Sequence, residues 1–288
     1  MPEPNNKIYL ETTALIDHVL KGWYPELKEI LDSSNHKTTS QYSCMEIKKG
    51  FLQNWILLYN KAIQYNSFHK ISQFISNLSR SPKRYYLGAC VDAVTLFENE
   101  YSKRMPIDLA ELYGKANEGE IRLEKFKSIL RTQIKRCFHK IKNSSDEVYN
   151  PMECFKDISE PKLENEMFYN HPDKCDSSQT KCNIKDFIKD NTDAFQKILE
   201  KLESLDNNKD DETKRRIISL KELLKNIRLN RNFDNTEPNQ KHCWNISDAI
   251  LAVIPKTDET IITSNLIHFE PICEAIGKSV KGYKSTLS

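Results

Sequence analysis

Residues 7–20, KIYLETTALIDHVL, join a short strand to a helix and so decide the class of the fold. KIYL is a run of strand-forming residues that ends at an acid, Glu11. The residues after it have the apolar spacing of a helix, for which Thr12 or Thr13 is the expected N-cap. A strand–turn–helix unit of this kind is typical of α/β domains with a parallel sheet.

Further stretches of α/β character lie near each end of the chain. Near the start, a helix over about 24–31 precedes a short strand at 38–40 and then a long helical stretch. Near the end, ISDAILAVI (246–254) predicts a helix, residues 260–263 predict a strand, and FEPICEAIG (269–277) predicts a short terminal helix.

The middle of the chain is mostly helical by its apolar spacing. Helices are expected from 65 to about 143 and from about 184 to 231, with a charged interruption at 206–216. Residues 143–183 contain three prolines and no visible period, which predicts irregular structure. Because separate terminal fragments could not each bury a core, we expect one α/β domain (1–64 and 239–288) interrupted by a large helical insertion (65–238).

Composition limits the class of protein but not its partner. The chain has 288 residues and a net charge of +2, so any basic surface must be a local patch. Only 7 glycines occur, which argues against an all-β protein. The start lacks a basic region followed by a long apolar stretch, and no apolar run approaches the ~20 residues of a membrane span. We therefore expect a cytoplasmic protein without membrane contact, in which the eight cysteines are mostly reduced.

Three acids and an amide stand out by position. Glu11 directly follows a predicted strand, Asp248 opens a helix, Glu46 lies on the helix after the second strand, and Asn265 directly follows the last strand. In parallel sheets, ligands bind outside the carboxyl ends of the strands. Carboxylates gathered there are stabilised by a hard cation such as Mg²⁺ or Mn²⁺, which can activate water for attack on a phosphodiester.

Each of these residues also has a purely structural explanation. Glu11 would then be an exposed strand-end acid, and Asp248 would be a helix N-terminal acid stabilised by the dipole. Glu46 would pair with Lys49 on a solvated face, and Asn265 would be a turn residue.

Four segments together resemble the motifs of the PIN-domain family: YLETTALID (9–17), SQYSCMEIKKGF (40–51), ISDAILAVI (246–254) and IITSNLIHFEPICEAIG (261–277). In that family an acid followed by Thr comes after the first strand, and Glu11 fits an ETT variant of it. Ser40 or Ser43 with Glu46 matches the second motif, and Asp248 matches the third. Thr263, Asn265 and Phe269 match the fourth. The resemblance covers about 5–60 and 240–280, but not the helical middle.

The resemblance implies a three-layer α/β fold with a central parallel sheet and a Mg²⁺- or Mn²⁺-dependent endoribonuclease. Glu11, Glu46 and Asp248 would hold the metal, and Asn265 would orient water or a metal-bound ligand. Because Glu11 is longer than the usual Asp and Asn265 is neutral, one well-held metal is expected rather than two. Contacts to nucleic acid are expected from Thr12, Lys48, Lys49, Ser264 and His268.

The expected substrate is single-stranded nucleic acid, RNA rather than DNA. Many members of the family are toxins of bacterial toxin–antitoxin pairs, and others act in phage defence or RNA processing. A cognate inhibitor, a partner in a defence complex or a second copy of the chain are therefore the partners that the resemblance suggests. Two alternatives stay open: a PIN-derived binding module without catalysis, and a helical interaction protein whose insertion is the working surface.

Two other features suggest binding sites. Cys154, His171, Cys175 and Cys182, with Cys137 and His139 upstream, could form a structural zinc site, although their spacing is loose and scattered thiols are the alternative. The stretch 120–142 is an amphipathic basic helix whose charge suits phosphate contacts or, alternatively, a solvated face. Its basic residues are Arg122, Lys125, Lys127, Arg131, Lys135, Arg136, Lys140 and Lys142.

Overall fold

The computed structural model describes residues 6–21, 24–79, 87–104, 118–153, 160–169, 183–205, 211–229 and 243–284. The chain divides into two compact units. The first comprises Met1–Met45, Asn143–Ile158 and Asp173–Ser288, and the second comprises Glu46–Lys142 and Ser159–Pro172. The first unit contains residues 1–45 and 239–288 of the predicted α/β domain, whereas residues 46–64 belong to the second unit.

A parallel sheet forms the centre of the first unit. In the described residues it has five strands in the order β3-β2-β1-β6-β7, and every neighbouring pair is parallel. The strands are β1 (Lys7–Leu10), β2 (His36–Ser40), β3 (Glu147–Tyr149), β6 (Glu259–Thr263) and β7 (Ser279–Gly282). The strands predicted at 7–10, 38–40 and 260–263 are confirmed, as is the α/β class with a parallel sheet.

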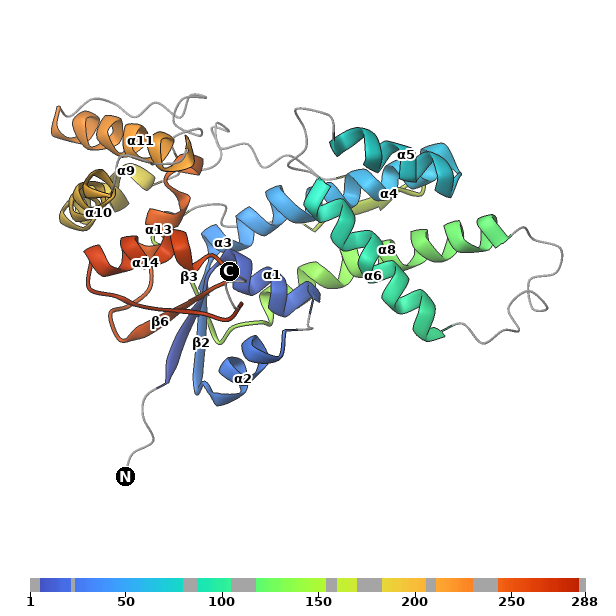
Figure 1. The fold of residues 1–288 in the computed structure, drawn as a ribbon, viewed down its shortest axis with the longest axis horizontal. Coiled ribbons are helices and arrows are strands. Elements are labelled where there is room, and N and C mark those ends of the chain that lie inside the picture. Colours follow the sequence, from blue (N-terminus) through green and yellow to red (C-terminus); the bar gives the residue numbers. More distant parts are fainter. Residues whose placement is uncertain are drawn as a thin grey trace. The chain divides into compact units, whose positions relative to one another are not determined.

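Helices cover both faces of this sheet. Tyr9 and Ile261 point into a core formed with α9 (Ile184–Asp190), α10 (Thr192–Ser204), α11 (Asp211–Arg228), α13 (Ser247–Val253) and α14 (Leu266–Ala275). Ile8 and Leu10 alternate with Tyr9 and are buried on the opposite face. Figure 1 shows α13 and α14 on one side of the sheet and α2 (Pro25–Ser33) on the other.

The expected boundaries of the insertion at 65 and 238 differ from those of the compact units. Helices α9, α10 and α11 belong to the first unit, because their apolar faces complete the core over the sheet. In α10 that face consists of Phe195, Ile198, Leu199 and Leu202. The charged stretch expected to interrupt the helices includes the start of α11, which begins at Asp211.

Two strands of the sheet were not predicted. Strand β3 lies in the stretch predicted to be irregular, which also contains β4 (Lys162–Glu164) and β5 (Met167–Tyr169). Strand β7 follows the helix that was expected to end the domain. Both β3 and β7 are short edge strands with polar residues, so neither has the apolar pattern of a buried parallel strand.

The second unit is mainly helical, as predicted for 65–143. It contains η2 (Ile47–Leu52), α4 (Gln53–Tyr65), α5 (Phe68–Ser79), α6 (Leu87–Arg104) and α8 (Glu118–Lys142). Strands β4 and β5 form a hairpin in this unit, and its two-residue turn, Asn165–Glu166, has positive φ at both residues, as a type I′ turn requires. Within the described part of the chain, none of the helices is long and apolar enough to cross a membrane.

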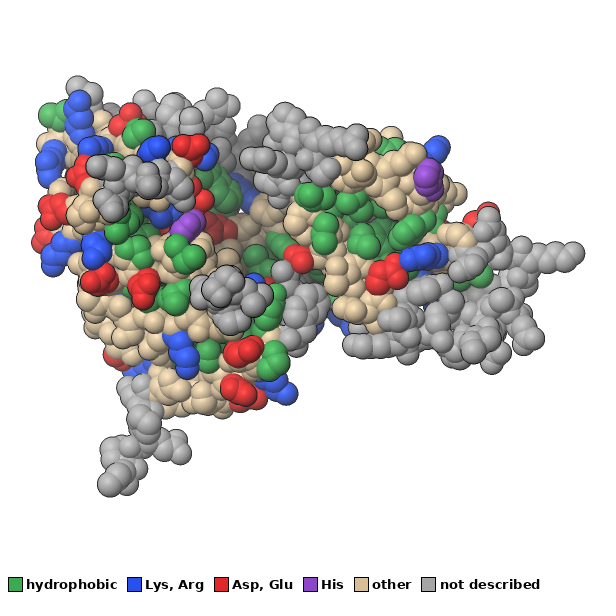
Figure 2. Space-filling view, viewed as in Figure 1, with side chains coloured by type: hydrophobic (Ala, Val, Ile, Leu, Met, Phe, Trp, Pro, Cys, Tyr) green, Lys and Arg blue, Asp and Glu red, His purple; other side chains and the backbone are tan. Residues whose placement is uncertain are grey.

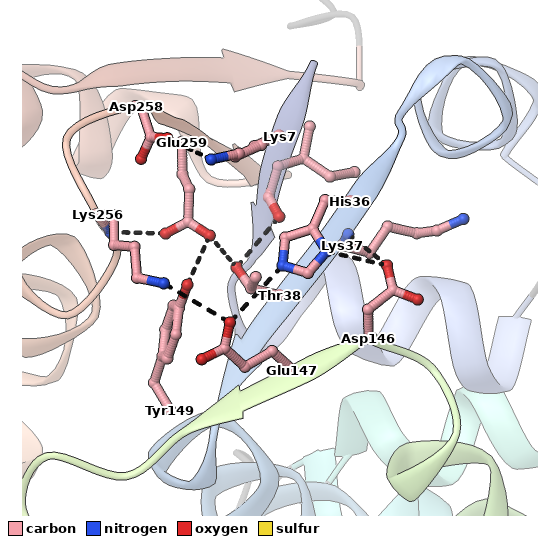
Figure 3. A network of polar contacts seen from close by, with 11 residues as sticks. Lys7, His36, Lys37, Thr38, Asp146, Glu147, Tyr149, Lys256, Asp258 and Glu259 are labelled. Carbon is pink, nitrogen blue, oxygen red and sulfur yellow. Dashed lines mark hydrogen bonds and ion pairs between the residues drawn. The ribbon is translucent and has the colours of Figure 1, made fainter. Parts of the chain in front are cut away.

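A buried polar network closes the amino edge of the sheet, where β1, β2, β3 and β6 begin (Figure 3). At its centre, Glu259 accepts hydrogen bonds from the Thr38 hydroxyl at 2.6 Å, the Tyr149 hydroxyl at 3.0 Å and the Lys256 backbone N–H at 2.6 Å. These contacts join three strands that are distant in the sequence. The network therefore attaches the short strand β3 to the sheet.

Replacing Glu259 with Ala should lower the free energy of unfolding by about 3 kcal/mol, because buried donors on three segments would lose their acceptor. The neighbouring Asp258 is half-exposed, and its ion pair within the described part of the chain is with Lys7. Asp258→Ala should therefore change stability little. Urea denaturation of both variants checks this expectation, and equal losses of stability would show that Glu259 does not stabilise the sheet.

Candidate acid and amide site at the carboxyl edge of the sheet

The strand order reverses between β1 and β6. From β1 the chain adds β2 and then β3 on one side, whereas β6 and β7 are added on the other side. Ligands of open α/β sheets bind at such a reversal, outside the carboxyl ends of the strands. Glu11 follows β1 and Ser264 and Asn265 follow β6, so both segments end at this position.

Glu11 is the N-cap of the short helix α1 (Thr12–Ile16). Its carboxylate accepts hydrogen bonds from the backbone N–H of Thr13 at 2.9 Å and of Ala14 at 3.3 Å, and from the Thr13 hydroxyl. The prediction that Thr12 or Thr13 caps this helix is therefore wrong. The Glu11 side chain folds back over the first turn of the helix, so its carboxylate serves as the cap.

The Glu11 carboxyl group is buried, with 1% of the residue exposed. Burial raises its pKa from 4.5 to about 7, although hydrogen bonds from Thr13 and Thr263 oppose the shift, and the nearby charge of Asp248 adds to it. Among the described residues no lysine, arginine or histidine forms an ion pair with Glu11. By contrast, the buried Asp17 pairs with Lys284 at 2.8 Å.

Thr13 connects the end of β6 to Glu11. Its hydroxyl donates to the Glu11 carboxylate and accepts hydrogen bonds from the backbone N–H of Ser264 at 3.0 Å and from the Ser264 hydroxyl at 2.9 Å. The second Thr of the ETT segment thus fixes the acid relative to the neighbouring strand end.

Thr13→Val should lower the free energy of unfolding by about 2 kcal/mol, because the Ser264 donors would lose their partner while side-chain volume is kept. Thr13→Ser keeps the hydroxyl and should lose clearly less. Thermal or chemical unfolding of the pair tests the role of the hydroxyl, and an equal loss in both variants would assign the effect to the methyl group instead.

Asp248 lies in the first turn of α13 and is held by Arg216 of α11. The Arg216 Nη2 donates to the Asp248 carboxylate at 2.6 Å and to Glu212 at 3.3 Å. The Arg216 side chain is 4% exposed, and the Asp248 side chain is 16% exposed. Asp248 is therefore a mostly buried acid whose charge is balanced by a buried arginine.

Asn265 and His268 complete this side of the site. The Asn265 Nδ2 and the His268 Nδ1 lie 3.1 Å apart, and the same ring nitrogen lies 3.7 Å from a carboxylate oxygen of Asp248. The contact with Asp248 raises the pKa of His268, while partial burial and the charge of Arg216 oppose the shift. Glu212, Asp248 and His268 are also the one group among the described residues that could hold a metal ion through acid and histidine atoms.

The structure places most of the predicted site in the first unit. Glu11 is linked to Ser264 through Thr13, Asp248 and Asn265 both lie against His268, and Thr12 is half-buried at the start of α1. The remaining predicted residues belong to the second unit: Glu46, Lys48 and Lys49.

Glu46 ends α3 (Gln41–Glu46) and is half-buried, so its role as a metal ligand stays a prediction. Lys48 is 3% exposed, and its contact with nucleic acid stays a prediction. Lys49 is half-buried, and its contact with nucleic acid also stays a prediction.

Sequence reasoning missed Arg216 and Glu212. Both lie in the stretch of alternating charges that was expected to interrupt the helices, where their only signal is an i,i+4 spacing of acid and base. That spacing is common on exposed helix faces, so it did not indicate that Arg216 would be buried against Asp248.

The two other candidate sites have different outcomes. Cys154, His171, Cys175 and Cys182 lie outside the described residues, so the zinc site stays a prediction. Upstream, Cys137 is buried in the second unit, where burial raises its pKa to about 12 and disfavours the thiolate that zinc needs, and His139 lies 3.9 Å from Glu160.

In the basic helix α8, several cations make contacts within the protein. Arg122 contacts Glu98 and lies over the rings of Phe68 and Phe97, and Lys127 pairs with Glu124. Arg131, Lys135, Arg136 and Lys140 are exposed, and the prediction of phosphate contacts stays open for them.

No protein-family model, curated protein or solved structure matches this chain. The family resemblance therefore rests on the four motifs and on the position of their residues in the sheet.

Proposed function

We propose that the chain is a metal-dependent nuclease with a PIN-like three-layer domain, and that its site lies at the carboxyl edge between β1 and β6. One observation carries the proposal: the carboxylate of Glu11 is buried without a described cationic partner, within electrostatic range of Asp248 and at the strand reversal. A buried acid in this state is unfavourable unless it is protonated or neutralised. A divalent cation would neutralise it.

The donor types present suit a hard cation, and the described acid and histidine group whose ligand atoms converge consists of Glu212, Asp248 and His268. Glu11 and Asp248 offer carboxylate oxygens and Asn265 offers an amide oxygen, which are the donors that Mg²⁺ and Mn²⁺ prefer. When bound, such a metal would lower the pKa of an attacking water and balance charge on the phosphate. The sequence-based expectation that Glu46 is a further ligand stays a prediction.

The protein's own residues have separable tasks in this proposal. Glu11 is fixed by Thr13 and by the first turn of α1, so its oxygens change position little. Asn265 and Asp248 converge on the Nδ1 of His268 from two different helices, which sets their spacing. His268, with its raised pKa, can present a proton to an oxygen of the substrate.

The proposed substrate is single-stranded nucleic acid, and RNA is favoured over DNA by the family resemblance alone. Incubation of the full chain with labelled single-stranded RNA and DNA of one sequence tests this directly. Cleavage is expected with Mn²⁺ or Mg²⁺ and should stop when a chelator is added. Cleavage that persists in excess chelator, or no cleavage of either strand with any divalent metal, would contradict the proposal.

A binding module without catalysis is the second candidate, and one observation favours it. The Asp248 carboxylate already has a cationic partner in Arg216, and Glu11 already caps a helix. Such a module would bind nucleic acid equally well with and without chelator, and it would leave the strand intact. The same incubation, followed by a gel-shift measurement, therefore distinguishes the two functions.

A further inference from the structure

Arg216 carries a buried donor that no described residue satisfies. Its Nη2 serves both Asp248 at 2.6 Å and Glu212 at 3.3 Å. Its Nε, in contrast, is one of the few buried side-chain nitrogen or oxygen atoms of the described residues without a hydrogen-bond partner. A buried N–H group without an acceptor is unfavourable, so this atom indicates a missing acceptor rather than a completed ion pair.

The geometry of the guanidinium group says where that acceptor belongs. Nε and Nη2 project from the same edge of the planar group, and this edge is the one that binds two oxygens of a carboxylate or a phosphate in parallel. In Arg216 only the Nη2 half of the edge is used. The Nε half of that edge is the part that lacks an acceptor among the described residues.

Glu212 is the contact that an incoming anion could replace. Its side chain is 59% exposed and its contact with Nη2 is the longer of the two, whereas Arg216 itself is 4% exposed. The Nδ1 of His268 lies 3.7 Å from the same Glu212 oxygen. An oxyanion in the place of the Glu212 carboxylate would therefore meet both the guanidinium group and the imidazole ring.

Resting on the nuclease proposed above, we propose that Arg216 binds a phosphodiester oxygen of the nucleic-acid chain through Nε and Nη2 and positions that phosphate beside Asp248. Figure 2 shows Lys and Arg side chains interspersed with Asp and Glu over α10 and α11, so the described surface there offers no continuous basic field. A single buried arginine then contacts one phosphate and fixes the register of the nucleic-acid strand.

Adjacent arginines on α11 provide a matched test. Arg215 is exposed and uses its Nε on the backbone oxygen of Asp211 at 3.1 Å, so Arg215→Gln and Arg216→Gln remove the same charge from neighbouring positions. Both are made in the full chain carrying Glu11→Gln, and their affinity for a labelled single-stranded RNA oligonucleotide is measured by fluorescence anisotropy at several salt concentrations. Arg216→Gln should weaken binding about tenfold and lower the salt dependence by about one phosphate contact, whereas Arg215→Gln should change neither.

A second variant keeps the test valid if Arg216→Gln does not fold. Glu212→Gln leaves Arg216 in place and removes the acid that competes for its edge, so RNA affinity should increase. Equal affinity and salt dependence in the two arginine variants, or an unchanged affinity in Glu212→Gln, would overturn the proposal. Binding of inorganic phosphate that depends on Arg216, without such binding of the oligonucleotide, would also overturn it.

The outcomes separate this inference from the nuclease itself. If RNA binding depends on Arg216 but the wild-type chain does not cleave RNA, the phosphate contact is supported and the nuclease proposal is wrong. If the wild type cleaves RNA and the Arg216→Gln chain with native Glu11 has the same KM and kcat, the nuclease proposal is supported and the phosphate contact is wrong.

Discussion

Glu11→Gln and Asp248→Asn should each reduce Mn²⁺-dependent cleavage of single-stranded RNA by at least about 100-fold. The reason is that each change removes a negative oxygen from one of the two acids proposed as metal ligands at the reversal between β1 and β6. Amides keep nearly the same shape, so the fold should persist. Initial rates measured with saturating Mn²⁺ check the expectation.

Glu259→Gln is the matched control for this experiment. Glu259 is also a buried carboxylate of the same sheet, but it lies at the amino edge and is held by Thr38, Tyr149 and a backbone N–H (Figure 3). Its amide variant should cleave RNA at close to the wild-type rate. Wild-type rates in the Glu11 and Asp248 variants, or an equal loss in all three variants, would contradict the assignment of the site.

The second large effect is a dependence of stability on pH that comes from Glu11. In the folded, metal-free protein its pKa is raised to about 7 from 4.5, so between these values the folded chain holds a proton that the unfolded chain has released. The free energy of unfolding contributed by Glu11 is therefore highest at low pH and falls as pH rises through this window. With about 1.4 kcal/mol for each tenfold difference in proton affinity, the change is about 3 kcal/mol.

The comparison with Glu11→Gln isolates this contribution, because all other groups titrate alike in both proteins. Relative to the wild type, the variant should gain about 3 kcal/mol between about pH 4 and about pH 8 in the absence of metal. Mn²⁺ binds the ionised carboxylate, so it should stabilise the wild type more at about pH 8 than at about pH 5, and the variant little at either. The measurement is urea denaturation of both proteins across this range of pH. If the difference between their free energies of unfolding stays constant, the pKa of Glu11 is not raised.

The sequence predicts those parts of the fold whose signal is local. The strand before Glu11 and the strand before Ser264 have short apolar runs that favour a buried strand, and their carboxyl ends share an edge because parallel strands run in one direction. The edge strands β3 and β7 lack this signal, because β7 contains a single large apolar residue, Val280, and β3 is exposed at its first two residues.

The parts of the site that escaped prediction depend on tertiary contacts. Arg216 reaches Asp248 only because α11 packs over the sheet with α13, and no local pattern in α11 indicates which buried partner its basic residues meet. Glu11 illustrates a different limit: its position was predicted, but its role as N-cap and its burial depend on how α1 begins. Propensity rules favour Thr at such a position, and the tertiary setting overrides them.

Direct titration of the metal-free full chain with Mn²⁺ by calorimetry, at about pH 7.5, tests the central claim that Glu11 and Asp248 form a divalent metal site. The wild type and Glu259→Gln are expected to bind Mn²⁺ with the same affinity and to release protons as Glu11 ionises. Glu11→Gln and Asp248→Asn are expected to lose most of that binding. Indistinguishable binding curves for all four proteins, or no binding by the wild type, would contradict the account.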